Sequence, residues 1–121
     1  MNILRFALVA VVAAASTSPA FAHALLDHAV PAVGGSVRGS PAEIALSFSE
    51  NVVASFSGIK LTAPDGAAVP TGKATVSPSS PATLRVSVGR ALKPGTYAVN
   101  WHAVSVDTHR TTGSYKFTVA P

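Results

Sequence analysis

Two separate parts of the 121-residue chain carry side chains that could together hold one metal ion. Asp107 and His109 stand two residues apart, and residues i and i+2 of extended backbone project to the same face. His23 adds two nitrogens if cleavage makes it the first residue, because its free amine and its ring Nδ1 can then chelate one ion. Three nitrogens and one carboxylate oxygen suit tetragonal Cu(II), the tightest binder among the divalent first-row metals. Zn(II) could use the same donors in tetrahedral geometry, and a solvated, frayed terminus is the alternative for His23.

The N-terminal segment has the anatomy of a secretory signal peptide. One positive charge in Met1–Arg5 precedes the uncharged apolar run Phe6–Ala15, and Ala20-Phe21-Ala22 supplies the small residues of a cleavage site. The apolar run is shorter than the roughly 20 residues that span a bilayer, a length that disfavours a retained anchor. We expect residues 1–22 to be removed outside the cytoplasm, which leaves a domain of residues 23–121. Cleavage after Ala24 would instead remove His23 and leave Leu25 first.

The composition excludes several kinds of chemistry. The chain has no cysteine, so disulfides, thiolate metal sites, iron–sulfur clusters and cysteine nucleophiles are ruled out. Nine Lys and Arg residues against five Asp and Glu residues give a net charge of +4. This excess is small and scattered, without any run of basic residues, so the sequence predicts no nucleic-acid partner.

Short runs of alternating apolar and polar residues predict an all-β fold. These runs, separated by Pro and Gly, are Glu43–Ser49, Ile59–Thr62, Thr83–Val88, Thr96–Val104 and Ser114–Val119. We expect about seven short strands in a two-sheet sandwich or small barrel. A Pro-Gly turn before Tyr97 resembles the tyrosine corner of immunoglobulin-like sandwiches, in which the phenol OH bonds to nearby backbone; an ordinary turn before a core aromatic is the alternative. Trp101 shares the Tyr97 face and is expected in the core, with ligand stacking as its alternative.

Motifs at both ends of residues 23–121 share their order and spacing with a known family. The opening motifs are His23-Ala24-x-Leu26, Pro31-Ala32-x-Gly34 and Leu46-Ser47-Phe48-Ser49-Glu50-x-Val52. The closing motifs are Leu92-x-Pro94-Gly95-x-Tyr97-x-Val99-x-Trp101, Ser105-x-Asp107-x-His109 and Gly113-x-Tyr115-x-Phe117-x-Val119. Together they resemble the CopC family of periplasmic copper-resistance proteins over essentially the whole of this domain.

The resemblance implies an immunoglobulin-like Greek-key sandwich of about seven strands that binds one Cu(II) ion in the periplasm. The implied ligands are the amine and ring of His23, together with Asp107 and His109. Glu50 stands where some members have a glutamate near the site. Glu50 is two residues after the core residue Phe48, so in a continuing strand its side chain would face the core. It fits a ligand role only if the strand has ended before it. The alternative is a solvated charge at the rim of the sandwich. The implied function is copper sequestration, resistance or delivery to a membrane partner, such as an inner-membrane copper transporter of the CopD type.

This sequence departs from the family pattern at several positions. Thr108 replaces the usual glycine between the two donors, and because threonine does not easily adopt a positive φ, the geometry of this turn is in question. His28 and His102 replace a usual serine and a usual arginine, and both are further candidates for metal contact, although His102 is expected at the surface. The only methionine is Met1. Without sulfur ligands in residues 23–121, we predict a Cu(II) site and no Cu(I) site.

Two other functions compete with copper binding. An immunoglobulin-like interaction module without metal would use the same fold. A histidine-brace copper oxidase, similar to the lytic polysaccharide monooxygenases, would also combine an N-terminal histidine with a second histidine. A domain this small with one Trp has little room for a flat sugar-binding platform, and a carboxylate in the copper plane resists reduction. We therefore predict a binding protein rather than an enzyme, with no polysaccharide partner.

Overall fold

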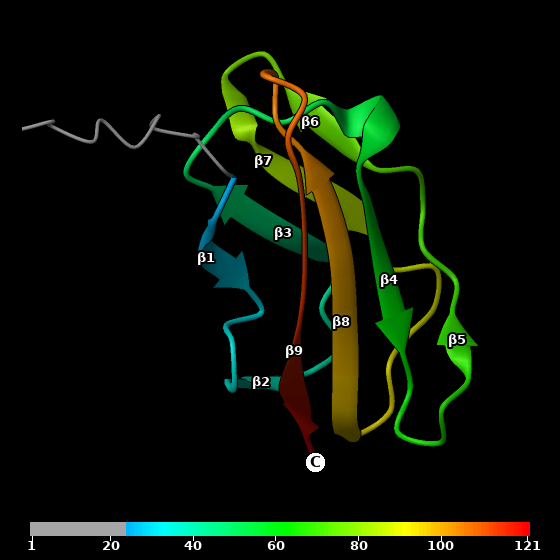
Figure 1. Ribbon diagram of the computed structural model, residues 1–121. Helices are drawn as coiled ribbons and strands as arrows, with labels where there is room; N and C mark the ends of the chain where they lie inside the picture. Colours follow the sequence, from blue (N-terminus) through cyan, green and yellow to red (C-terminus); the bar gives the residue numbers. More distant parts are fainter. Residues whose placement is uncertain (1–23) are drawn as a thin grey trace, which may run out of the picture.

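The computed structural model describes residues 24–121, which form a sandwich of two β-sheets (Figure 1). The chain also contains one 3₁₀ turn among its described residues, η1 (Ala54–Phe56). The strands are β1 (Leu26–Val30), β2 (Ser36–Arg38), β3 (Glu43–Phe48), β4 (Gly58–Thr62), β5 (Ala68–Val69), β6 (Thr75–Ser77), β7 (Ser80–Ser87), β8 (Gly95–Val104) and β9 (Arg110–Ala120). No helix in this part of the chain is long and apolar enough to span a bilayer. The expected signal peptide, residues 1–22, and His23 lie outside the described residues.

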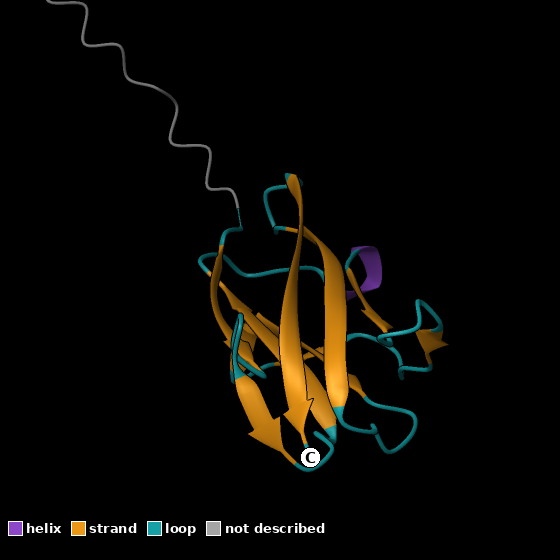
Figure 2. Cartoon of the chain, turned by 90° about the horizontal axis from the view of Figure 1, so that it is seen from below, coloured by secondary structure: helices purple, strands orange, loops and turns teal. Residues whose placement is uncertain are grey.

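The strand order is that of an immunoglobulin-like sandwich. One sheet has the order β1-β3-β7-β6 and the other the order β2-β9-β8-β4-β5, and Figure 2 shows the two layers from below. The four-stranded sheet matches the A-B-E-D sheet of that fold. The β9-β8-β4 part of the five-stranded sheet matches its G-F-C sheet. The all-β Greek-key prediction is therefore confirmed. The described residues contain nine strands rather than about seven, because β2 and β5 extend the second sheet at its two edges, with β2 parallel to β9.

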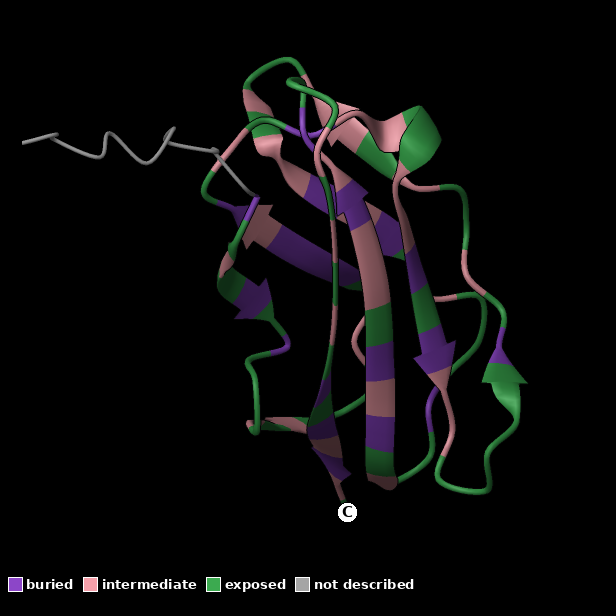
Figure 3. Ribbon diagram, in the orientation of Figure 1, coloured by how far each residue is buried: buried purple, intermediate pink, exposed green. Residues whose placement is uncertain are grey.

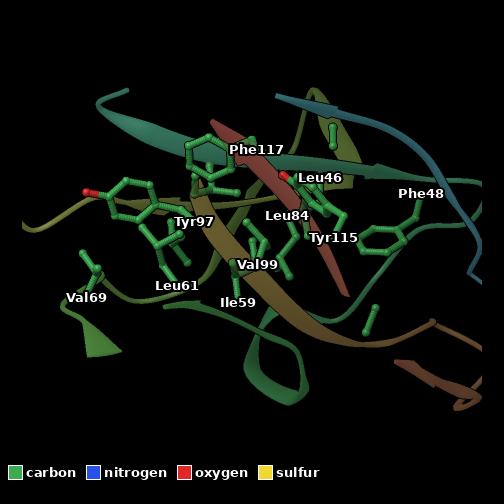
Figure 4. Close-up of a cluster of buried hydrophobic side chains, with 14 of the residues drawn as sticks. Leu46, Phe48, Ile59, Leu61, Val69, Leu84, Tyr97, Val99, Tyr115 and Phe117 are labelled. Carbon is green, nitrogen blue, oxygen red and sulfur yellow. The ribbon is translucent and has the colours of Figure 1, made fainter. Parts of the chain in front are cut away.

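The predicted alternation of residues fills the space between the sheets. Buried residues alternate with exposed or intermediate ones along β4 and most of β8 in Figure 3. Leu46 and Leu84 from the first sheet lie against Val99 and Phe117 from the second, and all four are at most 1% exposed (Figure 4). β8 and β9 pair along their whole length, from Gly95 opposite Val119 to Val104 opposite Arg110. This long hairpin rests on the core and carries the turn between residues 104 and 110 at its end.

The two aromatic residues singled out in the sequence occupy the expected positions. The Tyr97 hydroxyl donates a hydrogen bond of 2.8 Å to the carbonyl oxygen of Lys93, which confirms the tyrosine corner. Trp101 is half-buried and meets Phe48 edge-on, with ring centroids 5.0 Å apart. Gly113 lies opposite Trp101 on β9, and any Cβ at that position would overlap the indole ring. Trp101 therefore packs against the core, as predicted.

Candidate metal centre

The turn that joins β8 to β9 brings Asp107 and His109 together. Ser105 donates its amide N–H to the His109 carbonyl at 2.9 Å, and Thr108 donates its amide N–H to the Ser105 carbonyl at 2.8 Å. These bonds close the turn, so the two donors meet in a turn rather than along a strand as the i, i+2 argument assumed. The result is nevertheless the expected contact, because His109 Nδ1 lies 3.3 Å from Asp107 Oδ1.

Thr108 has a φ of 74°, in the left-handed region. The replacement of the family's usual glycine by Thr108 therefore does not change the sign of φ in this turn. The backbone keeps the positive φ that a glycine would adopt without strain. A β-branched residue in this region is a genuine outlier. Such strain persists only where the surroundings enforce it, and here the two backbone bonds of the turn do so.

Ser105 orients the Asp107 carboxylate. It is a buried polar residue, 1% exposed, and its hydroxyl donates a hydrogen bond to Asp107 Oδ1. The His109 amide N–H also points to Oδ1, at 3.4 Å. The Ser105 hydrogen bond, followed by the contacts with His109, lowers the pKa of Asp107 below its usual range. Asp107 therefore remains an anion over the pH range in which a cation site has to work.

The first described residues are fixed beside this turn. Ala24 is fully buried, and its carbonyl oxygen accepts a 2.8 Å hydrogen bond from the Thr111 hydroxyl, two residues beyond His109. Leu25 and Ser49 exchange two hydrogen bonds, since the Leu25 amide donates to Ser49 Oγ at 2.9 Å and the Ser49 amide donates to the Leu25 carbonyl at 2.8 Å. In Figures 1 and 2 the start of the described chain, just before β1, and the β8–β9 turn lie towards the same end of the sandwich. His23, the remaining predicted ligand, lies outside the described residues.

Glu50 follows the last residue of β3, Phe48, by two positions, so the strand has ended before it. The side chain of Glu50 is therefore not constrained to the core-facing side of β3, and its position is compatible with a ligand role. The next residue, Asn51, accepts a hydrogen bond of 3.1 Å from the Val106 amide, which joins this loop to the β8–β9 turn. Within residues 24–121, however, no three His, Cys, Asp or Glu side chains are grouped so that they could hold a metal ion. The role of Glu50 stays a prediction.

The two other histidines lie on strands. His28 is exposed on β1 opposite Ser47 of β3. His102 lies on the outer face of the second sheet, between Gly58 of β4 and Thr112 of β9, which confirms its expected surface position. In the part of the chain that the structure describes, neither histidine completes a group of three possible metal ligands.

Sequence reasoning missed the residues that support the site. Ser105 appears in the quoted motif, and a serine two positions before Asp-x-His is the signal that could have suggested its contact with the carboxylate. Thr111 and Ser49 hold the start of the domain, but their partners are distant in sequence. The Thr111–Ala24 bond joins residues 87 positions apart, and no local pattern indicates such a contact.

Fold and site together define an immunoglobulin-like β-sandwich with a carboxylate–imidazole pair at one end. The family model of the CopC domain matches residues 26–120. The chain belongs to the CopC family.

Relatives match it over most of their length. Protein YobA of Escherichia coli K12 is 42% identical over 116 residues, which cover 96% of this chain and 94% of that protein. The crystal structure of CopC from Methylosinus trichosporium OB3b is similar with a TM-score of 0.77 and 30% identity, covering 82% of this chain and 95% of that one. The structure of PcoC, a methionine-rich copper resistance protein from Escherichia coli, is similar with a TM-score of 0.72 and 39% identity, covering 81% and 99%.

Proposed function

We propose that this chain is a periplasmic Cu(II)-binding protein that takes up one ion per chain. Its role is copper sequestration, resistance or delivery to a membrane partner, for which an inner-membrane copper transporter of the CopD type is the candidate. Three observations support the proposal: the copper resistance named for PcoC, the secretory pattern of residues 1–22, and the Asp107–His109 pair. The role is binding rather than catalysis.

The observation that carries the proposal is the attachment of Ala24 to β9. Ala24 is held to Thr111 by a hydrogen bond. Consecutive Cα atoms are about 3.8 Å apart, so the peptide bond keeps His23 close to that point. Thr111 in turn follows His109 by two positions. This proximity supports His23 as the donor of an amine and a ring nitrogen to the same ion as Asp107 and His109. It requires cleavage after Ala22.

The contacts of the turn suggest which atoms bind the ion. Nδ1 of His109 is buried against Asp107 Oδ1, whereas the His109 side chain as a whole is 38% exposed. We therefore assign Nε2 of His109 to the metal, with Nδ1 facing the carboxylate. A carboxylate in this position fixes the tautomer of a ligating histidine and raises its basicity. The contacts of Asp107 described above all use Oδ1, so we assign its Oδ2 to the ion, and Glu50 is the candidate for a further oxygen ligand.

The ligand types favour Cu(II) over Cu(I). Amine, imidazole and carboxylate donors suit Cu(II), whereas Cu(I) prefers thiolate and thioether sulfur. This chain has no cysteine, and its only methionine is Met1. In this respect it differs from the methionine-rich PcoC.

The test is calorimetric titration of the exported protein, with its first residue established by intact mass, together with paramagnetic resonance. We expect one Cu(II) per chain and a spectrum of four-coordinate nitrogen and oxygen ligation. One glycine added before His23 removes the chelate of amine and ring, and the affinity should collapse. Equal affinity in the extended protein would falsify the chelate.

Matched substitutions separate the site from the surface. His109→Gln should abolish tight binding, whereas His102→Gln, an identical change on the outer face, should leave it intact. Acidification should release copper because protons compete for the nitrogen donors, while the lowered pKa of Asp107 keeps its carboxylate ionised. Loss of affinity in both variants, or in neither, would contradict this assignment.

A further inference from the structure

The outer face of the five-stranded sheet carries a set of cations that point away from the core. Lys60 lies between the buried residues Ile59 and Leu61 of β4, so its side chain lies on the opposite side of the strand. Lys116 is likewise flanked by buried residues on β9, and Arg38 follows the inward-facing Val37 of β2. All four members are exposed. We call the set formed by Arg38, Lys60, Arg110 and Lys116 the basic face.

Charge is segregated between this sheet and the rest of the domain. Residues 24–121 contain eight Lys and Arg residues, of which four form the basic face, whereas none of the five Asp and Glu residues lies in β2, β4, β5, β8 or β9. The ion pairs among the described residues, Arg85–Glu43 and His109–Asp107, involve no member of the basic face. Cations that are scattered along the sequence are thus gathered by the fold and left without carboxylate partners in this part of the chain.

The shape and chemistry of this face fit an anionic surface better than a protein partner. The exposed large hydrophobic residues of the described chain all lie outside these five strands, on β1, η1 and loops (Leu25, Val30, Val33, Phe56 and Val106). Protein interfaces take most of their binding energy from central, well-packed side chains such as aromatic anchors, whereas Trp101, which borders the basic face, is half-buried against Phe48. Between Lys60 and Arg110 lies an open hollow of about 370 Å³, whose lining also includes His102 and Trp101.

We propose that the basic face binds the anionic phospholipid headgroups of a membrane surface. Basic residues attract anionic lipids from the membrane surface, and the attraction falls off within a Debye length. Arg110 directly follows His109, so a domain lying on this face holds the candidate metal centre beside the membrane. The proposal concerns the copper-free protein and does not depend on the proposed copper site.

The experiment is co-sedimentation of the exported, copper-free protein with vesicles of phosphatidylcholine, with and without phosphatidylglycerol. We expect binding only to vesicles that contain phosphatidylglycerol, and weaker binding as salt is raised. Each cation near the surface contributes about fivefold, so the double variant Lys60→Gln/Lys116→Gln should lower the partition coefficient about 30-fold. The matched control is Lys73→Gln/Lys93→Gln, which removes the same charge outside the basic face and should change the coefficient little.

Several outcomes would overturn the proposal. These are equal binding to both kinds of vesicle, an equal loss in the two double variants, or binding of a polyglutamate peptide without binding of the anionic vesicles. The last result would indicate an acidic protein partner instead. Copper titration of the same variants separates this proposal from the proposed function, because loss of Lys60 and Lys116 should leave copper affinity unchanged. Thermal melting checks that every variant is folded.

Discussion

Replacing Thr108 by glycine should stabilise the sandwich. Thr108 has a φ of 74°, and a left-handed conformation costs a residue with a Cβ about 1–2 kcal/mol. Glycine removes this penalty but loses more conformational freedom on folding, which costs about 0.5–1 kcal/mol. The difference between these two ranges is about 0–1.5 kcal/mol, and its midpoint is a net gain of about 0.75 kcal/mol in the free energy of unfolding. For a domain of this size, this midpoint corresponds to a rise in Tm of about 3–6 °C.

The assay is thermal melting of the metal-free protein, with two further variants as controls. Thr108→Ala keeps a Cβ and therefore most of the penalty, so its Tm should stay below that of the glycine variant. Thr108→Asn should lie between them, because asparagine tolerates the left-handed region better than most residues. A glycine variant that melts at or below the wild-type Tm would refute the reasoning, because the positive φ would then store no strain.

Three other changes test the packing. Tyr97→Phe removes the hydrogen bond to the Lys93 carbonyl and should lower the free energy of unfolding by about 0.5–1.5 kcal/mol in urea denaturation; an unchanged value would exclude a stabilising tyrosine corner. Gly113→Ala places a Cβ against Trp101, with an expected loss of about 1–3 kcal/mol and altered emission from the single Trp; unaltered emission would contradict this contact. Burial raises the pKa of Tyr115 to about 12, whereas an unfolded tyrosine titrates near about 10. The unfolded state then binds fewer protons, so stability should fall as pH rises from about 10 to about 12, and Tyr115→Phe should abolish this slope.

The strands that build the core could be predicted because their signal is local. The alternating run Thr96–Val104 lies within β8, Ser114–Val119 within β9, and Thr83–Val88 ends one residue beyond β7. No run was predicted for β1. None was predicted for the short strands β2, β5 and β6 either, because three residues or fewer cannot display an alternation. These three short strands exist because β9, β4 and β7 offer them backbone partners, and this is information that their own sequences lack.

The candidate site divides in the same way. Asp107 and His109 were predictable from residue type and spacing, and the structure brings them together. The positive φ of Thr108 was not predictable. Threonine prefers a negative φ, and the hydrogen bonds that close the turn override this preference. The attachment of Ala24 to Thr111 depends on the complete sandwich, so only the folded chain brings the start of the domain to its last hairpin.

That attachment has a consequence for when metal can be acquired. Under the proposed function, the ion is held between the first residue of the domain and the β8–β9 turn, two points that only the folded sandwich brings together, so we expect loading to follow folding. At a free metal concentration 100 times the Kd, such an ion stabilises the folded state by about 2.7 kcal/mol, or about 10–20 °C in Tm. Under the proposed function, the ion takes in this cysteine-free chain the part that a disulfide plays in other sandwiches, with the difference that acid or a competing chelator can undo the cross-link.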